Sequence, residues 1–95
     1  MRDTHERARL RIVVSGRVQG VFFRRAAAEQ ARALGIAGHA RNLADGTVEI
    51  VGEGSRGALE LLAAWARHGP PAARVDEARL EWSGSLNEFS NFRVR

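Results

Sequence analysis

Apolar and polar residues alternate near the start of the chain and then change to a helical spacing. Leu10, Ile12 and Val14 fall on one face of an alternating segment, which is the period-two pattern of a half-buried strand. Residues 22–34 are rich in alanine, with apolar positions at roughly helical spacing, and Gly35 supplies a C-terminal stop. This part of the chain therefore predicts a strand followed by a helix.

A hairpin is predicted directly after this helix. Residues 37–42 read as a short strand, and Asp45-Gly46 is a typical turn pair. Val48 and Ile50 then fall on one face of the next strand. The segment therefore predicts two strands joined by a tight turn.

The second half of the chain predicts another helix, followed by two strands. Ser55 is the expected N-cap of a helix that runs to about His68, and the Gly-Pro-Pro run at residues 69–71 ends it. Residues 75–82 alternate as a fourth strand, and residues 89–94 are a candidate fifth strand.

The resulting order, βαββαβ with one more candidate strand, predicts an α+β protein of two layers. An antiparallel sheet with two helices on one face is the natural layering for this order. We expect a ferredoxin-like βαββαβ sandwich whose sheet has four or five strands and is antiparallel or mixed. Residues 1–7 are predicted to be a flexible tail and residues 8–95 a single domain, without repeats or linkers.

The composition narrows the chemistry that the chain can perform. All fifteen basic residues are arginine, and the net charge is +4. Without lysine there is no Schiff-base chemistry, and any grip on phosphate must come from arginine or backbone amides. The chain also contains no cysteine, which excludes disulfides, cysteine nucleophiles and cysteine-bound metals.

Composition and hydrophobicity also indicate where in the cell the protein is expected. A cysteine-free chain is compatible with a reducing cytoplasm. No stretch approaches the ~20 apolar residues that span a bilayer, and the charged residues 1–7 lack the apolar segment of a secretory signal. We therefore expect a cytoplasmic protein that does not associate with a membrane. The scattered histidines His5, His39 and His68 predict no metal site.

The most informative stretch, residues 16–24, joins the first strand to the first helix. Gly16 and Gly20 allow a tight curl, because glycine reaches positive φ without a steric penalty. The helix that begins near Phe22 points unpaired N–H groups into this curl, which suits it to phosphate. Arg24 can fold its guanidinium over the same space and bind phosphate oxygens. Paired glycines are also common in plain turns, but the apolar Val-Gln-Gly-Val composition indicates a loop packed down in a defined shape.

A second stretch, residues 38–46, places an asparagine before the Asp-Gly turn. Asn42 in this position often bonds only the turn backbone, so the residues alone leave a structural role open. Together, the Val-Gln-Gly-Val-Phe-Phe-Arg run and this second stretch resemble the signature of the acylphosphatase family. The resemblance covers nearly the whole chain from Ala8 onward. His39 and Ala44 depart from the family pattern, in which a large aromatic residue and a proline are usual.

The resemblance implies an activity and a role for each matching residue. In the family, the loop holds the phosphoryl group of an acyl phosphate and the asparagine positions the attacking water. Arg24 and Asn42 are then the catalytic residues. The implied phosphate-binding residues are Gln19, Gly20, Val21, Phe22 and Arg24, the first four through their backbone amides. The resemblance also implies a small acyl phosphate as substrate and neither a metal nor another cofactor, and we expect a monomer.

The remaining side chains are compatible with such a substrate. No pair of carboxylates, no serine–histidine–aspartate set and no metal cluster stands out in the sequence. An acyl phosphate releases a carboxylate whose conjugate acid has a pKa of about 4, so no general acid is needed. Catalysis can then rest on positioning and electrostatic stabilisation, which are what phosphoryl transfer mainly requires.

Two other classes of function share part of this pattern. RNA-binding modules of the same βαββαβ order need exposed aromatic residues on their central strands, whereas this chain has no tyrosine. The residues expected on the solvent side of the first and third strands are Arg9, Arg11, Val13, Thr47, Glu49 and Val51. No nucleic-acid partner is therefore expected. The second alternative is a non-catalytic anion sensor, which would need the loop but no residue to position water. The presence of Asn42 argues against it.

Overall fold

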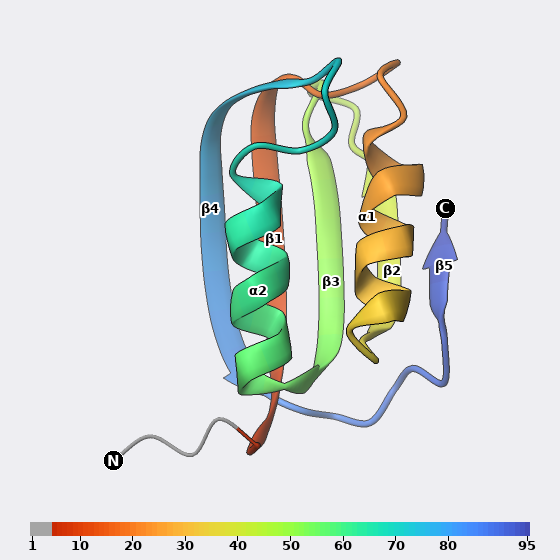
Figure 1. Cartoon of the computed structure of the whole chain (residues 1–95), viewed down its shortest axis with the longest axis vertical. Coiled ribbons are helices and arrows are strands. Elements are labelled where there is room, and N and C mark those ends of the chain that lie inside the picture. Colours follow the sequence, from red (N-terminus) through yellow and green to blue (C-terminus); the bar gives the residue numbers. More distant parts are fainter. Residues whose placement is uncertain (1–4) are drawn as a thin grey trace.

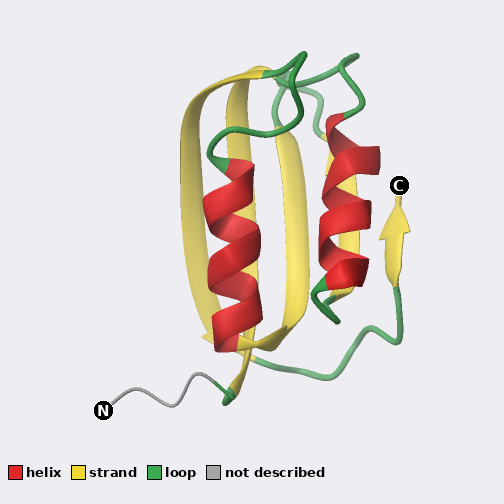
Figure 2. Cartoon of the chain, viewed as in Figure 1, coloured by secondary structure: helices red, strands yellow, loops and turns green. Residues whose placement is uncertain are grey.

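The computed structural model describes residues 5–95, which form five strands and two helices (Figure 2). In chain order the elements are β1 (Arg7–Arg17), α1 (Phe23–Ala33), β2 (Ala37–Asn42), β3 (Val48–Ser55), α2 (Arg56–Ala66), β4 (Arg74–Gly84) and β5 (Phe92–Val94). The predicted order is confirmed, including the candidate fifth strand. Neither helix of the described chain is long and apolar enough to span a membrane.

The strands form one sheet in the order β4-β1-β3-β2-β5, and both helices cover the same face of it (Figure 1). β1 pairs antiparallel with β3 and β4, and β3 pairs antiparallel with β2. β5 runs parallel to β2 at the edge of the sheet. The predicted ferredoxin-like α+β sandwich is confirmed, and its sheet is mixed and five-stranded.

The hydrophobic core lies between the helices and the inner face of the sheet. Leu10, Ile12 and Val14 of β1 share this face as predicted, and each is at most 1 % exposed. The buried helical side chains are Phe23, Ala27, Ala28 and Ala31 of α1 and Leu59, Leu62, Ala63 and Ala66 of α2. Removal of this apolar surface from water, worth about 25 cal/mol per Å², is the main force that joins the two layers.

α2 begins where the sequence predicts, and β1 begins slightly earlier than predicted. The hydroxyl of Ser55 accepts a hydrogen bond from the backbone N–H of Ala58 at 3.2 Å, so the predicted N-cap is confirmed. β1 begins at Arg7, one residue earlier than the alternating pattern suggests. Residues 1–4 of the predicted tail lie outside the described residues.

The outer face of the sheet, opposite the helices, differs from the prediction. Glu49 and Val51 are expected on the solvent side, but they are only 4 % and 5 % exposed. Arg11 and Arg41, from the strands on either side of β3, each bind the Glu49 carboxylate through Nε at 2.6 Å. Long arginine side chains cover apolar surface with their stems and keep their charge available, so this face is lined with ion pairs rather than open to water.

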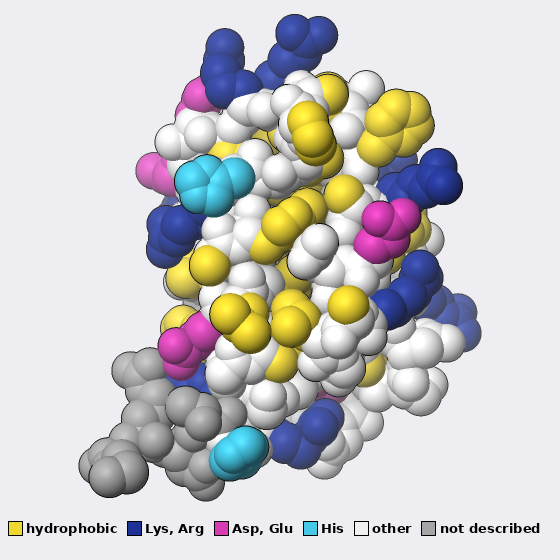
Figure 3. All heavy atoms as spheres, viewed as in Figure 1, with side chains coloured by type: hydrophobic (Ala, Val, Ile, Leu, Met, Phe, Trp, Pro, Cys, Tyr) yellow, Lys and Arg dark blue, Asp and Glu magenta, His cyan; other side chains and the backbone are white. Residues whose placement is uncertain are grey.

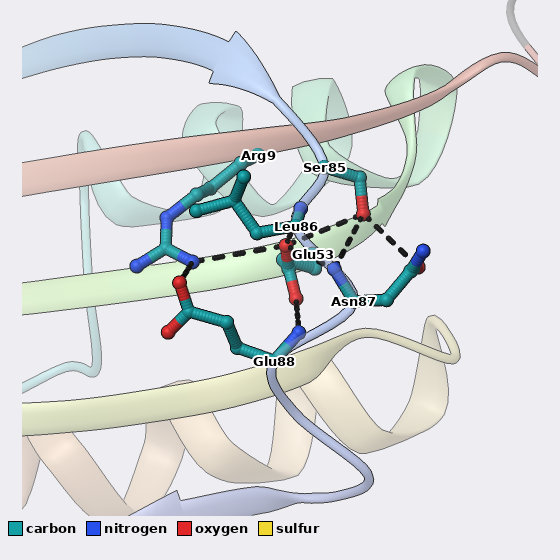
Figure 4. Close-up of polar contacts among 6 residues, drawn as sticks. All are labelled: Arg9, Glu53, Ser85, Leu86, Asn87 and Glu88. Atoms are coloured by element: carbon teal, nitrogen blue, oxygen red, sulfur yellow. Dashed lines mark hydrogen bonds and ion pairs between the residues drawn. The ribbon is translucent and has the colours of Figure 1, made fainter.

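We call residues 85–91, which join β4 to β5, the strap. The side chain of Glu53 on β3 is fully buried, and its carboxylate accepts hydrogen bonds from the backbone N–H groups of the strap (Figure 4). The donors are Leu86, Asn87 at 3.1 Å and Glu88 at 2.9 Å. One buried carboxylate therefore fixes the strap against the sheet and directs β5 to its place beside β2.

Candidate active site

The loop between β1 and α1, residues 18–22, has an unusual backbone shape. Gly20 and Phe22 both lie in the left-handed region, with φ values of 76° and 64°. Glycine adopts this conformation readily, whereas it costs a phenylalanine about 1–2 kcal/mol. Val18 and Val21 fix the loop, because they are only 1 % and 7 % exposed. The loop is therefore packed down as predicted, and strained backbone of this kind is concentrated at functional sites.

The backbone N–H groups of this loop are available to a ligand. Within residues 5–95, those of Gln19, Gly20, Val21 and Phe22 donate to no protein acceptor. α1 begins directly after them without a side-chain cap, and its first turn contains no acidic residue. Among the described residues, neither a side-chain cap nor an acidic residue of the first turn compensates the partial positive charge of this helix terminus, which favours an anion here.

The side chain of Gln19 joins this loop to the turn between β2 and β3. Its Nε2 donates to the main-chain carbonyls of Leu43 at 2.8 Å and Thr47 at 2.9 Å. Asn42, which directly precedes Leu43, is thereby held next to the loop. Sequence reasoning gave Gln19 only a backbone role. The signal that could have revealed more is a long polar side chain within an otherwise apolar loop.

A cavity of about 230 Å³ lies where the loop meets the ends of β2 and β5. Its lining residues are Val18, Gly20, Phe22, Phe23, Arg24, Arg25, Asn42 and Val94. Arg24 and Asn42 are thus brought together with Gly20 and Phe22 of the loop. Gln19 and Val21 do not line this cavity, so a binding role for them rests on their backbone N–H groups alone.

Arg24, in the first turn of α1, is oriented by the last residue of the sequence. Its Nη1 donates to the main-chain oxygen of Arg95 at 2.6 Å, and the N–H of Arg95 donates to the carbonyl of Ala40 at 2.8 Å. The guanidinium is therefore tied to β2 through residue 95, while it retains further N–H groups for a ligand. The sequence gives no signal for this partner, which lies 71 positions away.

Asn42 is the last residue of β2 and is exposed. Within residues 5–95, its carboxamide makes no hydrogen bond to protein, although asparagine at this position often bonds the turn. Asp45 stabilises the turn instead, since its Oδ1 accepts from the N–H of Thr47 at 3.0 Å and from its hydroxyl at 2.6 Å. These hydrogen bonds from Thr47 also lower the pKa of Asp45. The Asn42 carboxamide is therefore left to interact with solvent or ligand.

The histidines do not contribute to this cavity. In the described part of the chain, no three His, Cys, Asp or Glu side chains are close enough to hold a metal ion. His39 takes the place expected of an aromatic residue: its ring meets that of Phe89 edge-on at 5.6 Å, and its Nε2 lies 3.6 Å from Glu49. Burial, together with the charges of Arg95 and Arg41, lowers the pKa of His39 and outweighs the opposing effect of Glu49. His39 borders a separate cavity of about 420 Å³, which contains neither Arg24 nor Asn42.

Nearly the whole chain matches one family, because the model described as "Acylphosphatase" covers residues 10–94. The chain belongs to the acylphosphatase family. It is 51% identical over 90 residues to an acylphosphatase of Anaeromyxobacter dehalogenans, with 95% of this chain and 97% of that protein covered. It is likewise 51% identical over 88 residues to an acylphosphatase of Pelotomaculum thermopropionicum, with 93% and 96% covered. The resemblance seen in the two sequence motifs is therefore confirmed.

Solved structures of acylphosphatases have the same fold. The enzyme of Coxiella burnetii matches with a TM-score of 0.89 at 38% identity, covering 95% of this chain and 94% of that one. The enzyme of Bacillus subtilis also gives 0.89, at 35% identity, covering 93% and 98%. The chain is accordingly a hydrolase of the acylphosphatase type, as predicted.

Proposed function

We propose that this protein hydrolyses the carboxyl-phosphate bond of small acyl phosphates by direct attack of a water that Asn42 positions, without a metal ion. The observation that carries the proposal is the cavity in which Arg24 and Asn42 meet the loop. Within the described chain, neither the loop N–H groups nor the Asn42 carboxamide is engaged by other protein groups. Donors for a phosphoryl dianion and a group able to bind water thus share one small space.

The phosphoryl group is held by the loop and by Arg24 in this mechanism. The backbone N–H groups of Gln19, Gly20, Val21 and Phe22 and the guanidinium of Arg24 donate to its oxygens as charge spreads over them. Donors already fixed in position need no reorganisation when that charge develops. The left-handed backbone at Phe22 and the tie between Arg24 and Arg95 support this, because both hold donors in place before substrate arrives.

Asn42 acts on the water in this mechanism. Its carboxamide oxygen accepts a hydrogen bond from the water and aligns the water oxygen with the phosphorus. As the new P–O bond forms, the bond to the acyl oxygen breaks and the carboxylate leaves with the electron pair. Because its conjugate acid has a pKa of about 4, it leaves unprotonated. The proton of the water passes to a phosphate oxygen, so the products are a carboxylate and inorganic phosphate.

The test uses purified protein and benzoyl phosphate, with and without EDTA, beside Arg24→Ala and Asn42→Ala. We expect turnover that EDTA leaves unchanged. Arg24→Ala should lower kcat/KM about thousandfold or more, because it removes the charged partner of the transition state. Asn42→Ala should lower kcat about a hundredfold while inorganic phosphate still inhibits competitively, because the loop is intact and only the water is misplaced.

Arg25→Ala is the matched control, since it removes the same charge from the adjacent position of α1. Arg25 also borders the cavity, but its side chain is exposed and forms an ion pair with Glu29 at 3.9 Å, so its loss should change kcat/KM less than about tenfold. Turnover that EDTA abolishes, or full activity in Arg24→Ala, would contradict the proposal. Phosphate binding without any turnover would instead indicate an anion sensor.

The same proposal assumes a cytoplasmic monomer that binds small acyl phosphates and no nucleic acid. Size-exclusion chromatography with light scattering tests the monomeric state. Retention on RNA at physiological salt by a protein inert toward benzoyl phosphate would favour the RNA-binding alternative. The ion pairs and the strap on the outer face argue against that alternative, because an RNA-binding sheet needs accessible aromatic residues there.

A further inference from the structure

Two exposed apolar side chains border the cavity that holds Arg24. Phe22 is 74 % exposed and Val94 is 45 % exposed, and both line this cavity. The other large exposed hydrophobic residues of the described chain, Leu61 and Leu86, do not line it. Figure 3 shows hydrophobic side chains uncovered near the end of the molecule where α1 begins, beside basic ones. The anion site is therefore flanked by apolar surface.

The side chain of Phe22 has no evident role in the fold. Its backbone is left-handed, a conformation that glycine would adopt without strain, and its ring is outside the core. The ring also borders a second cavity of about 250 Å³, lined by Phe22, Arg25, Ala26 and Glu29. It therefore has open space beside it in which an apolar group can be buried.

Val94 is held at the cavity by contacts of the main chain. It is paired with Ala40 of β2 in the parallel register of β5. The next residue, Arg95, accepts the 2.6 Å hydrogen bond from Arg24 Nη1. The position of Val94 relative to the Arg24 guanidinium is therefore fixed.

We propose that Phe22 and Val94 form an acyl-binding subsite that favours acyl phosphates with an apolar, and above all an aromatic, acyl group. This inference rests on the proposed function. The loop N–H groups and Arg24 take the charged phosphoryl head, which leaves the acyl group at the exposed rim formed by Phe22 and Val94. An aromatic acyl ring placed there loses apolar contact with water and gains an aromatic contact with Phe22.

The test compares benzoyl phosphate with acetyl phosphate, which share the reacting group and differ in the acyl group. Phe22→Ala and Phe22→Gly both remove the ring, but only the glycine relieves the left-handed strain, so an effect common to both belongs to the ring. We expect the KM for benzoyl phosphate to rise about fivefold relative to that for acetyl phosphate in both variants, and about twofold in Val94→Ala. The ratio of the two kcat values should stay nearly constant, because uniform binding is lost.

Leu61→Ala is the matched control, since it removes an exposed apolar side chain of α2 that does not border the cavity; it should leave both KM values unchanged. Inhibition by inorganic phosphate reports on the head site alone. If Phe22→Ala weakens phosphate inhibition as much as it raises the KM for benzoyl phosphate, the loop is distorted and the subsite is refuted. Equal changes for both substrates would also refute it. A wild-type protein that hydrolyses neither substrate would refute the proposed function itself.

Discussion

At the scale of single residues, the Gln19 carboxamide sets the distance between the two halves of the site. It joins the loop that offers N–H groups to the turn that follows Asn42. In-line attack on phosphorus is sensitive to such a distance, because a displacement of about 1 Å can cost about a hundredfold in rate. Gln19 is therefore a positioning residue for Asn42 in the proposed mechanism.

Gln19→Ala should lower kcat by about tenfold to a hundredfold, because the loop and the turn are no longer tied together. It should also lower the free energy of unfolding by about 1–2 kcal/mol, since the carbonyls of Leu43 and Thr47 each lose one of two donors and keep the backbone N–H of the turn. Steady-state kinetics with benzoyl phosphate and urea denaturation measure the two effects.

Thr47→Val is the companion variant, because it disturbs the same turn through the Asp45–Thr47 contact and leaves Gln19 in place. It should reduce stability with less effect on kcat. If Gln19→Ala lost stability but kept full kcat, the positioning role would be wrong and Gln19 would be only a structural brace.

Sequence reasoning predicted the loop, Arg24 and Asn42 as site residues because they lie in compact motifs, and the structure brings them to one cavity. It did not find the partners of these residues, since a hydrogen bond between positions 19 and 43 or 24 and 95 leaves no local pattern. The left-handed φ of Phe22 was also unforeseen, because phenylalanine gives no signal for a conformation that normally indicates glycine.

At the scale of elements, the strap depends on the charge of one carboxylate. Burial by itself would raise the pKa of Glu53, but hydrogen bonds from the N–H groups of Leu86 and Glu88 and from the Ser85 hydroxyl outweigh it and lower the pKa. Because this pKa is lower in the folded than in the unfolded chain, the contribution of Glu53 to stability is complete above the ordinary glutamate pKa of about 4.3. It is lost as the pH falls through the folded-state value.

Glu53→Gln should lower the free energy of unfolding by about 2–4 kcal/mol at neutral pH. A carboxamide brings N–H donors to a position where several donors already converge. The difference from wild type should stay constant from about pH 7 to about pH 4.3 and then shrink as the pH falls through the folded-state pKa, because wild-type Glu53 then loses its own charge. Urea denaturation across this range measures it.

Glu81→Gln serves as the control for charge alone, because Glu81 is 68% exposed and forms an ion pair with Arg11 at 3.3 Å. It should cost less than about 1 kcal/mol at any pH. A Glu53→Gln variant that behaved in the same way would show that the strap does not depend on the buried carboxylate.

Periodicity predicted the elements well because each strand and helix buries a repeating face against the core. It failed on the outer face, where Glu49 is expected on the solvent side but is buried, and it gave no prediction for Glu53, which is also buried. Arg11 and Arg41 cover Glu49, and the strap covers Glu53. All of these groups belong to other elements than β3. A pattern within one strand cannot reveal cover that other strands supply.

At the scale of the whole molecule, β5 completes the cavity. It lies at the sheet edge beside β2, supplies Val94 to the cavity lining and brings the main-chain oxygen of Arg95 to Arg24. The sequence suggested a fifth strand but not its parallel pairing, because the pairing depends on the path of the strap across the molecule. The motifs predicted the acylphosphatase family without knowledge of this pairing.

A chain that stops at Val94 should have a kcat/KM about tenfold lower than the full chain, because Arg24 loses the oxygen that orients it. Arg95→Ala is the matched comparison, since it removes the side chain and keeps the main-chain oxygen, and it should remain close to wild type. Kinetics with benzoyl phosphate separate the two variants. If the shortened chain kept full activity, the tie to Arg95 would have no role in orienting Arg24.

The position of β5 at the sheet edge also has a consequence for how the chain folds. The cavity collects residues 18–25, Asn42 at the end of β2 and Val94 of β5, and Arg95 holds Arg24 beside it. Contacts between such distant segments form late in folding, because long loops must close first. We therefore expect a refolding chain to regain its helices and central strands no later than its hydrolytic activity, which in the proposed mechanism also requires the last strand to dock.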